Sequence, residues 1–229
     1  MQKTHPEHHK YLTLLSIFYV IILLVTLVVE NRVIMLGSMH LLSGSLILPL
    51  SYALSDVITE VYGYRVMRRL IWQSLVVLYV VALVIFLILL TPTDTSNSID
   101  LAYNASLKFL PANIITYSIA SVSSIFLNSY LLSKWKIRLH GRFFWMRSLG
   151  STLIGELIFI LVWSAIGFVG VFPLKELLQI MVMSYLCKFV YNIIMITFAA
   201  MLAARLKRVE NTDIYDRSVN FNPFSLKVE

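Results

Sequence analysis

The stretch from Tyr11 to Val29, YLTLLSIFYVIILLVTLVV, decides what kind of fold this chain can adopt. It is as long as the roughly 20 apolar residues that a helix needs to cross the hydrocarbon of a bilayer. It is too long for the core of a signal peptide, and it runs into Glu30, Asn31 and Arg32 without a small-residue cleavage site. The sequence therefore predicts a retained transmembrane helix.

The composition of the whole chain points to the same solvent. Of the 229 residues, 59% are hydrophobic and 14% are charged, against roughly 45–50% and 25% in soluble domains. The mean hydropathy of +0.80 shows that most of the length is apolar. This argues against a water-soluble globule. The single cysteine, Cys187, permits neither an internal disulfide nor a cysteine metal cluster.

Five further apolar stretches follow, separated by charged or turn-forming segments. They are about Met39–Val57, Leu70–Leu90, Phe109–Leu132, Phe143–Val171 and Leu177–Leu202. We therefore expect an all-α integral membrane protein with six transmembrane helices. The expected organisation is a short tail over residues 1–10, a six-helix membrane domain over 11–205 and a weakly ordered tail over 206–229.

Lysine and arginine are distributed unequally between the two sides of the predicted bundle. Fifteen fall in the two tails and in the loops that share their side, three fall on the other side, and Lys188 lies inside a span. The positive-inside rule then places both termini in the cytoplasm. It also explains the net charge of +7 without a nucleic-acid partner. His5, His8 and His9 could bind a metal, but a solvated tail is the favoured interpretation, and we expect neither a metal nor a cofactor.

The second span carries two acids where charge is expensive. Asp56 and Glu60 are four residues apart, so both carboxylates lie on one helix face, with Tyr52 one turn earlier. Two like charges this close favour a shared proton or a bound cation. In the alternative, the span ends near Asp56 and both acids pair with basic residues of the following segment, Arg65, Arg68 or Arg69.

Polar stripes also mark the fifth and sixth spans. Ser148, Thr152 and Glu156 recur every four residues, and Glu156 falls near the predicted middle of the bilayer. Lys188 and Asn192 form a similar stripe on the sixth span. Ionisable residues inside a membrane are functional candidates by default, although Glu156 could also pair with Lys188 only to hold the two helices together. The serine-rich fourth span, which includes Asn128, is typical of close helix packing.

Together these residues predict a polar pocket for a flat, hydrogen-bonding solute. A carboxylate can accept two hydrogen bonds from the N1 and N2 edge of a guanine-like base while an aromatic ring stacks on it. The sequence has no H-E-x-x-H, G-x-S-x-G or P-loop motif, so we expect no enzymatic activity. Any uphill transport must then be driven by a gradient, a partner or metabolic trapping.

The segment Ser55–Tyr64, SDVITEVYGY, followed by the basic Arg65 to Arg69, resembles the signature of the queuosine precursor transporter family, which is also called vitamin uptake transporter-like. Supporting pieces are Glu30 to Arg32, Arg147 to Glu156, and Lys188. The resemblance implies a six-helix bacterial inner-membrane protein that imports 7-deazaguanines such as preQ0 and preQ1. The residues that it carries over are Asn31, Asp56, Glu60, Tyr62, Gly63, Arg147, Thr152, Glu156 and Lys188.

The chain departs from the family pattern at three places. An acid often follows the fifth-span glutamate by three or four residues, but Phe159 and Ile160 stand here. An acid is also usual near Asn192, and Thr197-Phe198 replaces a Thr-Pro pair. The expected pocket is therefore less acidic than the family pattern implies.

The expected substrate-binding residues combine the polar stripes and the resemblance. They are Asn31, Tyr52, Asp56, Glu60, Tyr62, Arg147, Thr152, Glu156, Lys188 and Asn192. With three spans per half, the second and fifth spans would be inverted counterparts that each carry an acid. Two rival interpretations remain: a substrate-capture subunit that needs a separate energising complex, and an intramembrane enzyme that uses Asp56 with Glu60. The expected partners are the small-molecule substrate and membrane lipid. The sequence does not decide whether the protein also needs an energising partner or forms a homo-oligomer.

Overall fold

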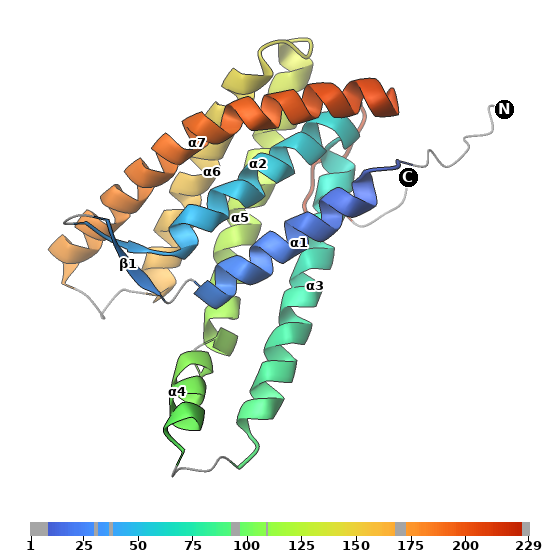
Figure 1. Ribbon diagram of the computed structural model, residues 1–229. Helices are drawn as coiled ribbons and strands as arrows, with labels where there is room; N and C mark the ends of the chain where they lie inside the picture. The colour runs from blue at the N-terminus through green and yellow to red at the C-terminus, as the bar shows by residue number, and fades with distance from the viewer. Residues whose placement is uncertain are drawn as a thin grey trace.

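A computed structural model describes residues 9–29, 32–36, 39–92, 97–108, 110–167 and 173–225. Within these ranges the chain is nearly all helical, with one short β-hairpin (Figure 1). The elements are α1 (Leu12–Val29), β1 (Val33–Leu36), β2 (Met39–Leu42), α2 (Gly44–Tyr62), α3 (Tyr64–Leu89), α4 (Ser98–Leu107), α5 (Leu110–Arg138), α6 (Phe144–Gly167) and α7 (Leu174–Glu210).

Five of these helices are long and apolar enough to cross a membrane. They are α1, α3, α5, α6 and α7. The remaining predicted span corresponds to α2, which is not in this group. Its sequence is less apolar, since it includes several serines, Asp56 and Glu60. A nearly all-helical, multi-span architecture is thus confirmed, while the crossing of all six helices, their orientation and the inverted 3+3 arrangement stay predictions.

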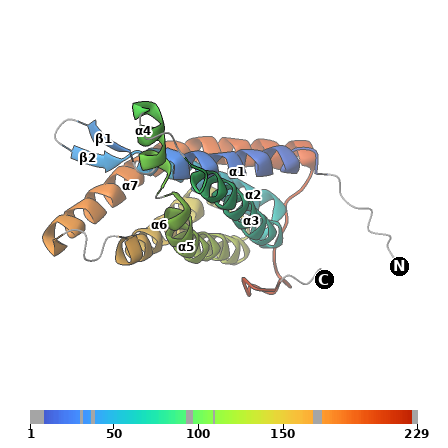
Figure 2. The same cartoon turned by 90° about the horizontal axis from the view of Figure 1, so that it is seen from below.

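Helix α2 lies at the centre of the bundle and packs against α1, α3, α5, α6 and α7. Figure 2 shows α1 and α7 on one side of the molecule and α5 with α6 on the other. Every residue from Ser55 to Tyr62 is buried. Because protein surrounds α2 on several sides, its polar side chains meet other side chains instead of lipid. This placement makes its acids available for interactions with the neighbouring helices.

The predicted second span is wrong at both ends. Its first residues form β2, which pairs in antiparallel register with β1, so that Val33 lies opposite Leu42. The hydroxyl of Ser43 donates to the carbonyl oxygens of Val29 (2.9 Å) and Arg32 (2.6 Å), which ties the hairpin to the end of α1. These long-range bonds override the local apolar pattern, and α2 begins only at Gly44.

At its other end α2 continues past Asp56 to Tyr62 as a helix, while the alternative in which the membrane span ends near Asp56 stays a prediction. It ends at Gly63, whose φ of +84° is a conformation that residues with a Cβ rarely adopt. A Cβ at this position would also lie 2.9 Å from Oδ1 of Asp216. Gly63 thus permits the sharp turn into α3 and a close approach of the chain's C-terminal segment.

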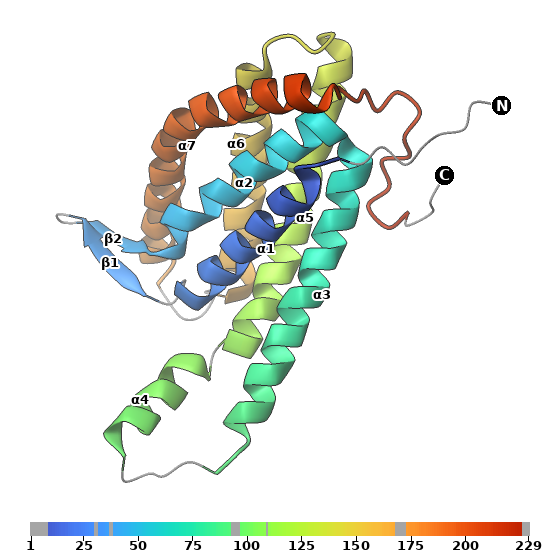
Figure 3. The ribbon, with the colours of Figure 1, turned by 45° about the vertical axis from the view of Figure 1, so that its right-hand side comes forward.

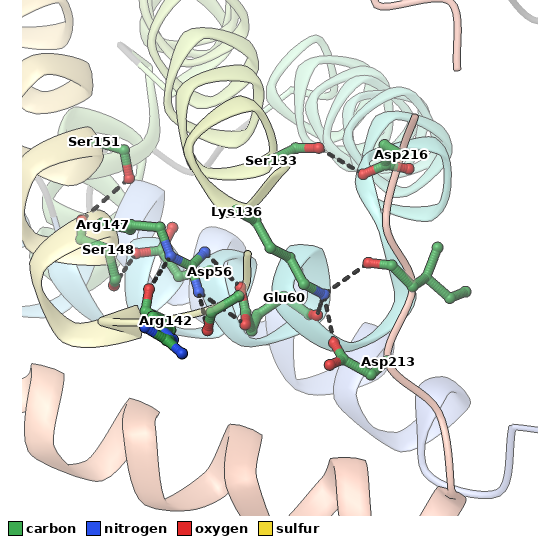
Figure 4. Close-up of polar contacts among 12 residues, drawn as sticks. Asp56, Glu60, Ser133, Lys136, Arg142, Arg147, Ser148, Ser151, Asp213 and Asp216 are labelled. Carbon is green, nitrogen blue, oxygen red and sulfur yellow. Dashed lines mark hydrogen bonds and ion pairs between the residues drawn. The ribbon is translucent and has the colours of Figure 1, made fainter. Parts of the chain in front are cut away.

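Residues 211–225, which the sequence analysis expected to be weakly ordered, follow a defined path against α2, α3 and α5. Asn211 ends α7 in the left-handed conformation that asparagine tolerates. The carboxylate of Asp216 then accepts hydrogen bonds from the backbone N–H of Tyr64 (2.8 Å) and the hydroxyl of Ser133 (2.6 Å) (Figure 4). An anion at the N-terminus of α3 is favourable because the first N–H groups of a helix lack internal partners.

Helix α7 extends well beyond its predicted end, Leu202. Its 37 residues would measure about 55 Å if straight, against roughly 30 Å of hydrocarbon. Figure 3 shows that α7 bends partway, so that its last turns run across the end of the bundle. The extension brings Lys207 and Glu210 close to residues of α1 and α2.

Candidate functional site

The carboxylate of Asp56 is buried and receives hydrogen bonds from two other helices. Its Oδ1 accepts from the amide of Asn128 on α5 at 2.6 Å. Its Oδ2 accepts from the hydroxyls of Ser148 and, at 2.9 Å, Thr152, both on α6. Figure 4 shows Asp56 and Ser148 facing each other. All three of these donors are neutral, and through them Asp56 links α2 to α5 and α6.

The local sequence explains why these donors converge. Ser148 and Thr152 are four residues apart on α6, so both hydroxyls lie on the face towards α2. Gly155, one turn further on, allows α5 and α6 to approach closely: a Cβ there would lie 3.1 Å from the Asn128 Cβ and 3.3 Å from the Tyr52 ring. The Tyr52 hydroxyl, nearby on α2, donates to Ser124 at 2.9 Å.

Glu60 lies one turn beyond Asp56 in a different, strongly charged environment. Its carboxylate accepts two hydrogen bonds from the Arg147 guanidinium, at 2.8 and 3.0 Å, and forms an ion pair with Lys207 at 2.6 Å. Arg147 and Glu60 are both at most 1% exposed. The ion-pair partners of Glu60 thus come from α6 and α7. They differ from the alternative in which the α2 acids pair with the basic segment at Arg65–Arg69.

Further charged residues, Lys136 and Asp213, connect Glu60 to the C-terminal segment. Lys136 on α5 donates to the backbone carbonyls of Glu60 and Ile214, and it forms an ion pair with Asp213 at 2.6 Å. Asp213 also pairs with Lys207 at 2.9 Å. We call Glu60, Lys136, Arg147, Lys207 and Asp213 the charge network. It connects α2, α5, α6, α7 and residues 211–225.

Asp213 is the most exposed member of the charge network. Partial burial acts to raise the pKa of its carboxyl, but the hydrogen bonds and positive charges of Lys136 and Lys207 outweigh that effect and hold the pKa below its usual range. Asp213 is therefore an anion at neutral pH and compensates two lysines at once.

Glu156 lies further along α6 and has an incomplete set of partners. Its Oε2 accepts a hydrogen bond from the Asn192 amide at 2.9 Å, while its buried Oε1 has no hydrogen-bond partner among the described residues. The ammonium group of Lys188 interacts electrostatically with Glu156 and lies 4.9 Å from the centre of the Phe159 ring. A carboxylate oxygen left unsatisfied in a buried place is a natural acceptor for a ligand donor.

Aromatic rings lie beside Glu156. Phe159 and Trp163 on α6 stack with 6.0 Å between ring centres and an interplanar angle of 10°, and Tyr117 on α5 meets both edge-on. These rings present flat apolar surfaces one to two turns from the carboxylate.

A small cleft separates α2, α6 and α7 at this site. It is lined by Ala53, Asp56, Ser148, Leu149, Thr152, Asn192, Met195, Ile196 and Ala199. Its free volume of about 10 Å³ holds about one water molecule. The described conformation is therefore closed around these polar residues, and the cleft is too small for a solute larger than water.

The structure separates the predicted site residues into two sets. Asp56, Thr152 and Asn192 line the cleft. Glu156 is connected to it through the hydrogen bond from Asn192 and interacts with Lys188, while the Tyr52 hydroxyl is bound to Ser124. Glu60 and Arg147 belong to the charge network instead.

Tyr62, a further predicted residue, lies apart from both sets. The Tyr62 hydroxyl donates to Glu210 at 2.8 Å, next to the His9 ring, at the end of the bundle away from Glu156. Asn31, like His5 and His8, lies outside the described residues. Among the residues that the structure does describe, no group of three histidine, cysteine or acidic side chains could hold a metal ion.

Sequence reasoning missed three participants. Asn128 was attributed to helix packing, yet its side-chain amide donates a hydrogen bond to Asp56; its signal was an amide side chain within a serine-rich apolar helix. Lys136 and Lys207 were counted only as loop and tail charges. Nothing in their local sequence indicates that both turn inwards to the Glu60 region.

The sequence model of a family described as "Putative vitamin uptake transporter" matches residues 43–202 of this chain, which is more than half its length. The chain belongs to this family. The resemblance to this family is thus confirmed, and the five long apolar helices agree with a multi-pass membrane protein. The matched region contains the cleft and most of the charge network, but not Asn31, Lys207 or Asp213.

One curated relative agrees with this membership. The chain is 28% identical over 146 residues to a Bacillus subtilis (strain 168) protein named "Probable queuosine precursor transporter". The match covers 63% of this chain and 64% of that relative, so it spans somewhat less than two thirds of either protein. No solved structure matches the chain significantly.

Proposed function

We propose that this protein imports queuosine precursors, 7-deazaguanines such as preQ0 and preQ1, across the inner membrane of a bacterium. The observation that carries the proposal is a pair of buried carboxylates: Asp56 lines the cleft between α2, α6 and α7, and Glu156 is hydrogen-bonded to Asn192, which also lines it. The name of the Bacillus subtilis relative supports this substrate class.

The chemistry of the cleft fits a guanine-like base. Such a base presents adjacent N1–H and amino donors, which one carboxylate can accept together, and a carbonyl acceptor. Glu156 has an unpaired oxygen in a buried position, and the Asn192 and Thr152 side chains offer polar groups beside the cleft. The stacked Phe159 and Trp163 rings supply a flat surface of the kind that binds aromatic ligands.

Transport further requires that the cleft open to each side in turn. Sites for small molecules have volumes of roughly 300–1,000 Å³, so the described cleft of about 10 Å³ corresponds to a closed state. In the proposal the charge network closes the end of the bundle where Lys and Arg gather, which the positive-inside rule assigns to the cytoplasm. Separation of Lys207 and Asp213 from α2 and α5 would open that end and release the substrate.

The experiment uses bacterial cells that cannot make queuosine and lack their own importer. The cells receive this gene and low external preQ0, preQ1 or queuine, and queuosine in tRNA is measured. Restored modification by a 7-deazaguanine supports the proposal and ranks the precursors. No restoration, with the protein shown to be in the membrane, contradicts it.

Host cells can supply an energising complex of their own, so purified protein in proteoliposomes provides the second arm. Uptake of labelled precursor, recovered chemically unchanged, excludes both the capture-subunit and the enzyme interpretations. Binding without uptake would instead identify a capture subunit.

A further inference from the structure

A groove on the opposite side of the bundle from the cleft runs between α5 and the C-terminal segment. Its walls are Tyr64 of α3, Val122, Ser123, Phe126, Leu127 and Tyr130 of α5, and Phe221, Pro223 and Phe224. Its volume of about 420 Å³ is within the range of roughly 300–1,000 Å³ that small-molecule sites show. The groove is thus large enough for a ligand, and the substrate cleft does not include any of its residues.

The C-terminal wall of the groove is held firmly in place. Arg68 donates to the carbonyl oxygens of Asn220 (2.6 Å) and Asn222 (3.1 Å), and the Trp72 indole N–H donates to that of Pro223 (2.9 Å). The Tyr64 hydroxyl donates to the Phe221 carbonyl at 3.0 Å. These bonds order the segment without filling the groove.

The groove itself is apolar and suits hydrocarbon. Most of its walls are aromatic or aliphatic, and the Ser123 hydroxyl already donates to the Ile119 carbonyl of its own helix at 2.9 Å. The adjoining faces of α3 and α5 expose large apolar side chains, including Val76, Val80 and Ile119, as lipid-facing helices do. A polar solute would find few partners here.

A positive charge stands at one end of the groove. The Lys134 ammonium lies 4.2 Å from the centre of the Phe221 ring and 5.8 Å from that of Tyr130, and both rings line the groove. Lys134 is exposed and lies one turn beyond Tyr130, whereas Val122 lies about 12 Å down α5 in the other direction. Tryptophan, tyrosine and lysine together are typical of the level of the lipid headgroups. We therefore expect the charged end of the groove at the membrane surface and its apolar length in the hydrocarbon.

We propose that this groove binds an anionic phospholipid, with one acyl chain between α5 and residues 221–224 and the phosphate beside Lys134. The combination of an apolar slot and a cation at its mouth favours an anionic lipid over a zwitterionic one, because one basic residue near the surface contributes about 1 kcal/mol of attraction.

Native mass spectrometry of the full-length protein tests this proposal. The protein is equilibrated with equal amounts of phosphatidylglycerol and phosphatidylcholine that carry the same acyl chains, and the retained lipid is counted. We expect one phosphatidylglycerol to be retained in preference. Lys134→Gln should lower that preference about fivefold, the equivalent of about 1 kcal/mol, and Val122→Trp should abolish retention by filling the groove.

Two matched variants serve as controls. Lys175→Gln removes an exposed lysine at the start of α7, and Val25→Trp adds the same bulk to an exposed position on α1; both should retain phosphatidylglycerol as the unmodified protein does. Equal retention of both lipids, retention that survives Lys134→Gln and Val122→Trp, or a mass that shows a second copy of the chain displacing lipid would overturn the proposal. Because Lys134 is exposed, Lys134→Gln should fold normally. The test therefore remains decisive even if Val122→Trp fails to fold.

Discussion

At the scale of single residues, the two acids of α2 have different partners and different roles. Sequence spacing correctly places Asp56 and Glu60 on one buried face, but it predicts a pair of interacting like charges. In the structure Glu60 forms ion pairs with Arg147 and Lys207, whereas Asp56 accepts hydrogen bonds from neutral donors on α5 and α6. The distinction depends on residues 72 to 147 positions away, which no local pattern contains.

Arg147 is the residue whose loss should cost the most stability. Besides Glu60, it donates to the carbonyl oxygens of Arg142 and Gly141. Arg147→Gln leaves Glu60 buried with a weaker neighbour, and breaking a buried pair in this way costs about 3–5 kcal/mol. We expect a marked fall in the melting temperature of the purified protein. Arg138→Gln, at an exposed position on α5, should change it little; similar effects of the two substitutions would contradict this account of the charge network.

At the scale of elements, the apolar stretches predict the long helices well because burial in lipid imposes a simple length and composition. They fail where polar contacts between distant residues set the ends of an element. Met39–Leu42 forms a strand, and α2 continues to Tyr62. The serine-rich α5 was correctly expected to pack closely, since Gly155 of α6 meets Ser124 and Asn128. The hydrogen bond that α5 donates to Asp56 through Asn128 was not predicted.

The closeness of α5 and α6 gives a prediction for two glycines of the same helix. A Cβ at Gly155 would lie 3.1 Å from both the Ser124 carbonyl oxygen and the Asn128 Cβ, whereas one at Gly167 would come no closer than 3.8 Å to Thr116. Gly155→Ala should therefore destabilise the protein by about 1–3 kcal/mol through overpacking. Gly167→Ala should be tolerated. Thermal unfolding of the two variants checks this, and equal stability would show that α5 and α6 can separate at no cost.

At the scale of the whole molecule, residues 211–225 complete the bundle by joining α3, α5 and α7 at one end. Composition alone predicts a weakly ordered tail, because the segment has few aliphatic residues and mixed charges. Its order comes from partners in distant elements: Ser133, Lys136 and the N–H of Tyr64. Such contacts could not be predicted without the fold.

The contact between this segment and the bundle should depend on pH. The pKa of Asp213 is lower in the folded protein than its usual value of 3.8, so its stabilising contribution is present above that value and is lost as the pH falls through the lower, folded pKa. The melting temperature of Asp213→Asn should thus lie below that of the unmodified protein at pH 7. The difference should shrink as the pH falls below about 4; a difference that grows on acidification would have the wrong sign for this account.

The central claim is that Asp56 and Glu156 form a substrate site, and one measurement tests it most directly. Purified protein and its Glu156→Gln variant are placed in proteoliposomes at equal amounts, and uptake of labelled preQ1 is followed, with Glu176→Gln at the exposed start of α7 as the control. Hydrogen bonds to charged groups contribute about 1.5–3 kcal/mol, which corresponds to a roughly ten- to hundredfold change. We predict uptake by the unmodified protein and by Glu176→Gln, and at least about a tenfold loss in Glu156→Gln. Equal uptake by all three proteins would contradict the assignment of the site.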